Sequence, residues 1–199
     1  MPKRDADKTK VKSTSQKKRS TDAIQMLKDD HRKVETLFDQ FLEEESGKKQ
    51  QIAQQIFHEL EVHSTLEEEL FYPAFQSQAD SAELAALEQD DEIEGEDTMD
   101  ASEIEGEDDD GTPEELVDEM ITQAYDEHRL VRDMIAQLRN NDASSLEFRQ
   151  SMIELQQAVA DHVSHEEDEL FPQAQLHMDT KTLGMQMQQR KQEILSAAA

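Results

Sequence analysis

The stretch EVHSTLEEELFYPAF at residues 61–75 has a near copy, ADHVSHEEDELFPQA, at residues 160–174. Each copy contains a His, a Glu four residues later and a Pro ten residues after the His. Residues four positions apart lie on the same face of an α-helix. The sequence therefore predicts two helices that each present a His and a Glu side by side, His63 with Glu67 and His162 with Glu166.

A second pair of short motifs precedes this repeat. DHRKV at residues 30–34 matches EHRLV at residues 127–131, which places His31 before His63 and His128 before His162 at nearly the same separation. The chain therefore consists of two copies of one helical hairpin, each with a His on its first helix and His-x-x-x-Glu on its second.

Apolar residues recur at three- and four-residue steps through all four segments, as expected of amphipathic helices. Thr112-Pro113-Glu114-Glu115 predicts the start of the third helix by a capping box, and Ser144-x-x-Glu147 predicts the start of the fourth. Pro73 is expected to end the second helix soon after it, and the fourth helix is expected to run to Pro172. Residues 180–196 predict a short C-terminal helix. The expected fold class is all-α, an up-down four-helix bundle built from the two repeated hairpins.

Helix geometry predicts that the repeated residues meet. Gly47 lies midway between His31 and His63, so a turn there returns the chain to the same level at about 1.5 Å per residue. Ser145 lies midway between His128 and His162. Because these His and Glu residues are in register with the apolar positions, we expect four His and two Glu at one level of the core.

Such a group suits a metal site. Burying unpaired carboxylates costs several kcal/mol each, and imidazole with carboxylate ligands suits Fe, Mn or Zn. A symmetric set indicates two ions rather than one. The alternative is a duplicated hairpin whose His and Glu form buried hydrogen-bonded pairs.

Composition bounds the rest of the chain. The formal net charge is −28, whereas residues 1–20 carry eight Lys or Arg and two Asp. We expect a basic disordered tail at 1–20, the bundle at 21–176, and a helical extension at 177–199. An acidic low-complexity linker at 88–111, with EIEGED twice, interrupts the bundle.

The charge argues against broad nucleic-acid binding. The absence of Cys, of a secretory signal and of a membrane span predicts a cytoplasmic protein.

The four motifs together resemble the hemerythrin-like HHE cation-binding family of bacterial type. The resemblance spans residues 22–176, and LGMQMQQRKQEIL near the C-terminus is also similar to bacterial members. It implies a non-haem di-iron centre in a four-helix bundle. The implied iron ligands are His31, His63, Glu67, His128, His162 and Glu166, with Glu67 and Glu166 as bridging carboxylates.

One position departs from the family pattern. Oxygen-carrying hemerythrins have an additional His on the third helix, where this chain has Ala124 or Tyr125. The departure argues against simple reversible oxygen carriage. Tyr125 is a candidate hydrogen-bond donor to a metal-bound species. Glu59 and His165 are candidates for supporting groups or extra ligands, whereas Glu68 and Glu167 are expected to be solvated.

Three functions compete. The first is a protein that holds two Fe ions, with Mn or Zn as substitutes, and binds or senses oxygen, nitric oxide, peroxide or iron. The second is an enzyme with catalase-like or nitric oxide-reducing activity. The third is a metal-free interaction bundle. The sequence singles out no catalytic residue beyond the expected ligands.

Overall fold

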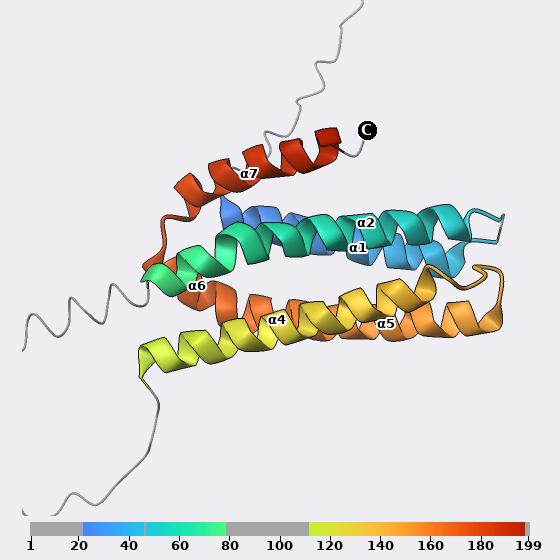
Figure 1. Cartoon of the computed structure of the whole chain (residues 1–199), viewed down its shortest axis with the longest axis horizontal. Coiled ribbons are helices and arrows are strands. Elements are labelled where there is room, and N and C mark those ends of the chain that lie inside the picture. The colour runs from blue at the N-terminus through green and yellow to red at the C-terminus, as the bar shows by residue number, and fades with distance from the viewer. Residues whose placement is uncertain (1–21, 46, 79–111, 198–199) are drawn as a thin grey trace, which may run out of the picture.

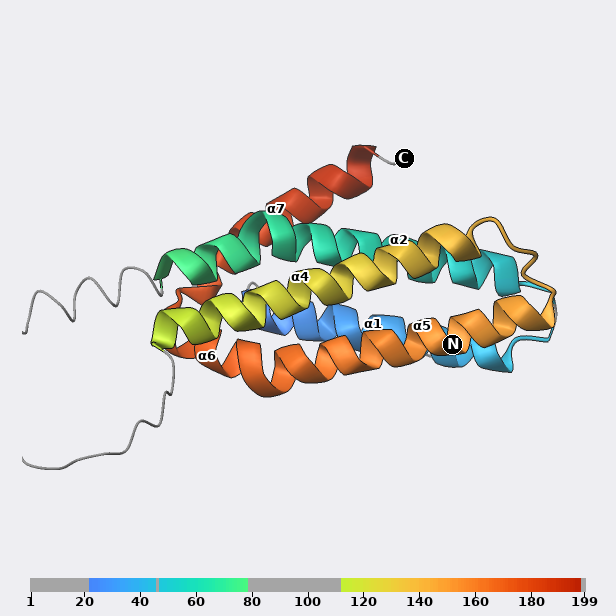
Figure 2. The ribbon, with the colours of Figure 1, turned by 60° about the horizontal axis from the view of Figure 1, so that its bottom comes forward.

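A computed structural model describes residues 22–45, 47–78 and 112–197 of the chain. The expected basic tail at 1–20 and the acidic linker at 88–111 lie outside the described residues. The described part forms the predicted all-α bundle, in which two antiparallel hairpins pack side by side (Figures 1 and 2).

The first hairpin consists of α1 (Ala23–Glu43) and α2 (Lys49–Leu66), and the second of α4 (Pro113–Leu138) and α5 (Leu146–His165). A five-residue π-helical turn follows each second helix, η1 (Glu67–Phe71) after α2 and η2 (Glu166–Leu170) after α5. The chain continues through α6 (Phe171–His177) into α7 (Thr180–Ala197), which lies at an angle across the first hairpin (Figure 1). The predicted C-terminal helix is therefore confirmed.

Local sequence signals place the helix ends. The Thr112 side chain accepts a hydrogen bond from the Glu115 amide and the Glu115 side chain accepts one from the Thr112 amide, which confirms the predicted capping box. The fourth helix instead starts one residue later than predicted, because Ser145 rather than Ser144 caps the Phe148 amide. Gly47 turns the first hairpin with a φ of 89°, a conformation that favours glycine.

The expectation that the fourth helix ends at Pro172 is wrong, and the second helix also runs past its proline, Pro73. Helix continues over residues 72–78 and through α6. Each Pro lies just after a π-helical turn, where the Tyr72 and Phe171 amides bond five residues back to Glu67 and Glu166. Proline has no backbone N–H to donate. The π-helical turn shifts the backbone hydrogen bonds from four to five residues back at this point, so the helix continues past the proline.

Two apolar clusters form the core, one on each side of the level occupied by the four paired His residues. One cluster joins the starts of α1 and α4 to the end of α2, η1, η2 and α6, and α7 adds Leu183 and Met187 to it. The other lies toward the interhelical turns and contains Phe38, Ile56, Ile135 and Val159. The polar level is therefore closed at both ends by apolar packing.

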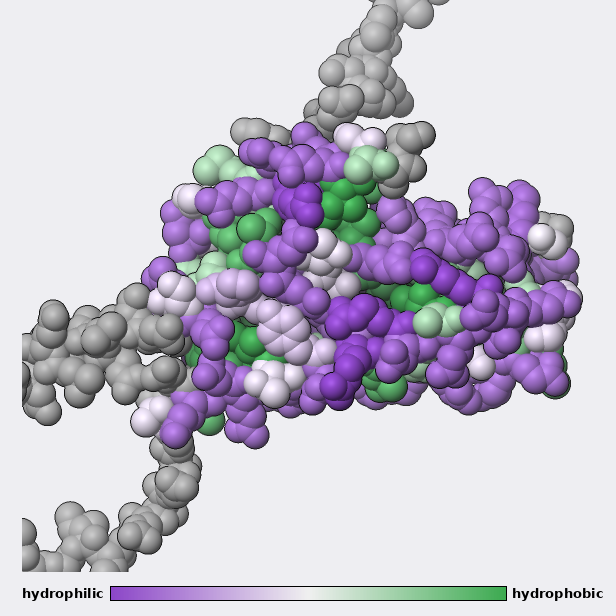
Figure 3. Space-filling view, in the orientation of Figure 1, coloured by the Kyte–Doolittle hydropathy of each residue, from purple (hydrophilic) through white to green (hydrophobic). Residues whose placement is uncertain are grey.

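The outer surface is mostly hydrophilic, as Figure 3 shows for one face, with apolar residues visible chiefly beneath α7 and between the helices. Large exposed apolar side chains such as Leu146 and Leu176 are scattered. Among the helices the structure describes, none has the length and hydrophobicity to cross a bilayer.

Replacing Phe148 by Ala is expected to lower the free energy of unfolding of the metal-free protein by about 3–5 kcal/mol, because Phe148 is fully buried. Leu146→Ala on the same helix is the control. Leu146 is 78% exposed, so its loss should change stability by no more than about 0.5 kcal/mol. Urea unfolding followed by circular dichroism measures both. Equal losses in the two variants would contradict this assignment of the core.

Candidate metal centre

The structure brings the predicted side chains together at one level between the two hairpins. Two Nε2–Nε2 distances are 3.2 Å, one between His31 and His63 and the other between His128 and His162. The buried residues that converge here are His31, His63, Glu67, His128, His162 and Glu166.

The two Glu residues join the hairpins. Glu67 Oε2 lies 3.1 Å from His63 Nε2 within its own hairpin and 3.3 Å from His128 Nε2 of the other. Glu166 Oε2 lies 3.4 Å from His162 Nε2 and 3.2 Å from His31 Nε2. Each carboxylate therefore sits between a His of each hairpin, as a bridging group would.

A second layer of carboxylates holds three of the four imidazoles from behind. Glu167 accepts from His31 Nδ1, Glu68 from His128 Nδ1 and Glu127 from His162 Nδ1, each at 2.9 Å. Glu68 and Glu167 were expected to be solvated, and that expectation is wrong. The π-helical turns η1 and η2 begin at Glu67 and Glu166, so the next Glu of each turn reaches the opposite hairpin.

Arg residues fix two of these three outer carboxylates. Glu68 also pairs with Arg132, and Glu167 accepts from Arg32 at 2.9 Å. The hydrogen bond from His128 lowers the pKa of Glu68. For Glu127, burial opposes the shift, but hydrogen bonds from His162 and Gln123 lower its pKa to about 2. The outer layer is therefore ionised at neutral pH and oriented to accept Nδ1–H.

This orientation decides what the inner nitrogens can bind. With Nδ1–H donated outward, a neutral imidazole presents a lone pair at Nε2. In the second hairpin two such lone pairs would face each other at 3.2 Å. Both oxygens of Glu67 and one of Glu166 are buried without a hydrogen-bond partner among the described residues. Protons on the imidazoles can relieve part of this, whereas cations satisfy all of it, so the donor set fits metal ions.

The two central carboxyls have opposite pKa shifts. Burial and the charge of Glu166 raise the pKa of Glu67 well above its usual value. Burial would also raise the pKa of Glu166, but His162 and His31 outweigh it and lower that pKa. Burial lowers the pKa values of these two His residues, but the contacts with Glu166 outweigh it, so both pKa values are raised. Burial and the charge of His31 lower the pKa of His63 well below its usual range.

Tyr72 is a site residue that sequence reasoning missed. Its hydroxyl donates to Glu166 Oε1 at 2.8 Å and lies 3.5 Å from His128 Nε2. Burial and the charges of Glu67 and Glu166 raise its pKa well above 10, so the group stays a neutral donor. The repeat offered one signal, since Phe171 occupies the equivalent position without a hydroxyl.

The other candidates lie farther out. Tyr125 packs edge-to-face against Tyr72, with ring centroids 5.3 Å apart. Its hydroxyl reaches the Glu68 backbone carbonyl rather than the paired His residues. Glu59 forms an ion pair with Lys33. His165 is buried and its Nδ1 lies 3.2 Å from Glu127, so it belongs to the outer layer. Two of the three candidates therefore have partners outside the centre, and His165 contacts it only through Glu127.

The fold and this group of residues define the class as a four-helix bundle with a buried His and carboxylate centre. The family model of the hemerythrin HHE cation binding domain matches the chain over residues 22–125 and again over 119–196. The chain belongs to this family, and membership implies cation binding.

Among solved structures, the chain is similar to a hemerythrin HHE cation binding domain-containing protein from Mycobacterium kansasii. The TM-score is 0.63 at 18% sequence identity, over 89% of each chain. At this identity the likeness concerns the fold alone. Comparison with curated protein sequences gives no match.

Glu67→Gln and Glu166→Gln should change the stability of the metal-free protein in opposite directions at pH 7. A carboxyl whose pKa is raised on folding destabilises the folded state above its unfolded pKa of about 4.3, so Glu67→Gln should stabilise by about 1 kcal/mol or more. Glu166 has a lowered pKa and stabilises the folded state in the same pH range, so Glu166→Gln should destabilise by a similar amount. Urea unfolding of both variants measures the signs, and shifts of the same sign would contradict the assignment.

Proposed function

We propose that the chain is a di-iron protein that binds or senses a small oxidant, with oxygen, nitric oxide and peroxide as the candidate ligands. The observation that carries the proposal is the convergence of four imidazole Nε2 atoms on two buried carboxylates, three of whose four oxygens have no hydrogen-bond partner among the described residues. Iron is favoured because mixed imidazole and carboxylate donors in a helical bundle suit a di-iron centre, and Mn or Zn are the substitutes.

The six inner residues would hold the metals, with Glu67 and Glu166 between the two hairpins. When bound, iron supplies the capacity to coordinate and reduce a small oxidant. The protein residues do the rest. The carboxylates of Glu68, Glu127 and Glu167 orient the imidazoles, and Tyr72 holds a proton 2.8 Å from Glu166 Oε1.

A cavity beside the centre indicates what size of ligand fits. It measures about 20 Å³, which is room for roughly one water-sized molecule. Leu60, Val131 and Ile135 form apolar walls, and His63, His128 and His162 line it on the inner side. A diatomic or peroxide molecule fits this space, whereas a larger organic substrate does not.

The corresponding position on the α1–α5 side is also hollowed. A groove of about 300 Å³ lies there, and His31, Phe38 and Val159 are among its lining residues. Phe38 occupies the place of Ile135 in the repeat and is almost fully buried, so the two sides differ in size and lining. The α2–α4 cavity is the smaller of the two and is lined by three of the four inner His residues.

Turnover of the oxidant is the second candidate function. The hydroxyl of Tyr72 supports it, because this buried neutral donor beside Glu166 holds a proton at the centre, where a bound oxidant would need one. Turnover of peroxide or nitric oxide by the iron-loaded protein would assign an enzyme. A spectral change without turnover would assign a sensor or a binding protein.

The metal-free interaction bundle is the weaker reading. Without metal, the buried carboxylate oxygens that have no hydrogen-bond partner would cost several kcal/mol of folding free energy. Metal-free protein that is fully stable, with no metal after expression in iron-rich medium, would nevertheless restore that reading.

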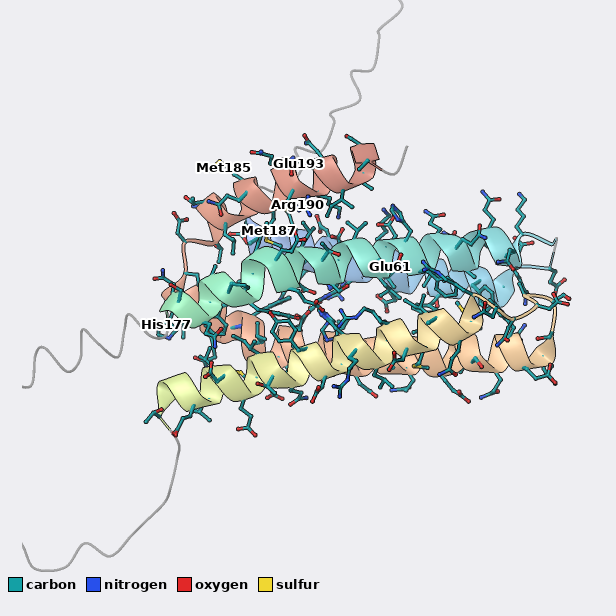
Figure 4. The ribbon with its side chains drawn as sticks, viewed as in Figure 1. Glu61, His177, Met185, Met187, Arg190 and Glu193 are labelled. Carbon is teal, nitrogen blue, oxygen red and sulfur yellow. The ribbon has the colours of Figure 1, made fainter. Side chains whose placement is uncertain are left out.

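Protein expressed in iron-rich medium is expected to contain about two Fe per chain, as di-iron bundles do. His63→Ala should lose at least about half of that iron, because it removes one inner ligand. His177→Ala is the control, since His177 is exposed and lies at the end of α6. Figure 4 marks His177 at one end of the bundle. Elemental mass spectrometry measures the iron content of the three proteins. Equal iron in all three proteins would contradict the proposed ligands.

Ile135→Phe is expected to slow nitric oxide binding to the reduced, iron-loaded protein by roughly tenfold, equivalent to about 1.4 kcal/mol in the barrier. The substitution fills the cavity with the side chain found at the repeat position, Phe38. Ile153→Phe makes the same chemical change at a residue that is 38% exposed and should leave the rate unchanged. Stopped-flow absorbance measures the rates. An unchanged rate in Ile135→Phe, with iron content preserved, would exclude this cavity as the route to the centre.

A further inference from the structure

The C-terminal helix α7 covers the first hairpin and is tied to it by two ion pairs. It packs on α1, α2 and η1, with Leu183, Gly184 and Met187 buried. Figure 4 shows Met187 and Arg190 on the side of α7 that faces the bundle and Met185 on the opposite side. No described helix covers the outer face of α4 and α5 in this way (Figures 1 and 2).

The ion pairs have different targets. Arg190 donates to both oxygens of Glu69, from Nε at 2.6 Å and from Nη2 at 3.0 Å. Lys191 Nζ donates to both oxygens of Asp30, at 2.6 and 2.5 Å. The Asp30 side chain is only 13% exposed and the Lys191 side chain 21%. Asp30 directly precedes His31, so the second ion pair lies next to the metal centre.

The support behind the four inner His residues is incomplete at one position. His31, His128 and His162 each have a carboxylate at Nδ1. The Nδ1 atom of His63 is buried and has no hydrogen-bond partner in the described part of the chain. The two halves of the centre therefore differ in their outer layer, although their inner residues match.

The repeat identifies which carboxylate is missing. In the second hairpin Glu127, directly before His128, supports His162. The equivalent residue in the first hairpin is Asp30, directly before His31, and the His it would support is His63. Asp30 is shorter by one methylene, and Lys191 holds both of its oxygens.

We propose that α7 makes the two metal positions inequivalent, because Lys191 holds Asp30 away from His63. This inference rests on the proposed di-iron function. A carboxylate behind a metal-bound His typically changes metal affinity by about 10- to 100-fold. The half of the centre built by His31 and His63 therefore releases its metal faster than the half built by His128 and His162. Undocking of Lys191 frees Asp30 to support His63 and strengthens the weaker half.

Transfer of iron from the iron-loaded full-length protein to a strong chelator tests this proposal. The wild type should release its iron in two phases of similar amplitude. Lys191→Met keeps an apolar stem but removes the ammonium, so the faster phase should slow by about tenfold. Arg190→Met is the matched control, since it breaks the neighbouring ion pair on the same helix and leaves Lys191 on Asp30. Its two phases should match those of the wild type.

A double variant separates the freed carboxylate from any general loosening of α7. Lys191→Met combined with Asp30→Asn should restore the fast phase, because no carboxylate remains to support His63. A fast phase in Lys191→Met that is unchanged or quicker would overturn the proposal, and so would slowing in Arg190→Met. A wild type that binds two Fe but releases them in one phase overturns this inference alone. A wild type that binds no metal overturns the proposed function as well.

Discussion

The whole bundle depends on one constraint, the burial of two carboxylates among four imidazoles at the interface of two hairpins. Neither hairpin satisfies this group alone. Glu67 reaches His128 and Glu166 reaches His31, so each half supplies an acceptor to the other. Apolar clusters on both sides keep water out, which raises the cost of leaving these groups unpaired. The arrangement is poor as a purely structural core and suited to cations.

The repeat gives the centre its symmetry, and departures from the repeat give it separate roles. Tyr72 places a hydroxyl where the second hairpin has Phe171. Ile135 lines a cavity of about 20 Å³, and Phe38 at the equivalent position lines a groove of about 300 Å³. Asp30 is bound by Lys191, whereas its repeat equivalent Glu127 accepts a hydrogen bond from His162. We propose that each departure sets one property of the site: proton donation at Tyr72, ligand access at Ile135 and metal retention at Asp30.

Much of this arrangement follows from the sequence. The repeated His-x-x-x-Glu, the upstream His residues and the midpoint turn at Gly47 predict the bundle and bring the right six residues to one level, because a helix converts spacing into direction and height. The capping box at Thr112 is also readable. Their role as metal ligands remains a proposal supported by donor chemistry and geometry.

What the sequence does not reveal depends on backbone geometry between helices. The π-helical turns at Glu67 and Glu166 cannot be read from a 3.6-residue period. The sequence therefore predicts that the fourth helix ends at Pro172 and that Glu68 and Glu167 lie in solvent, and the structure contradicts both. Tyr72 was missed for the same reason, because the wider turn changes the direction of the residues after Glu67. The ion pair between Lys191 and Asp30 joins residues 161 positions apart, which no local pattern predicts.

Diffraction data collected at the iron absorption edge from crystals of the iron-loaded protein would test the central claim most directly. The account predicts two anomalous peaks per chain inside the bundle, one beside His31 and His63 and the other beside His128 and His162, with Glu67 and Glu166 between them. Anomalous density confined to acidic groups on the surface, with none among the four imidazoles, would contradict it.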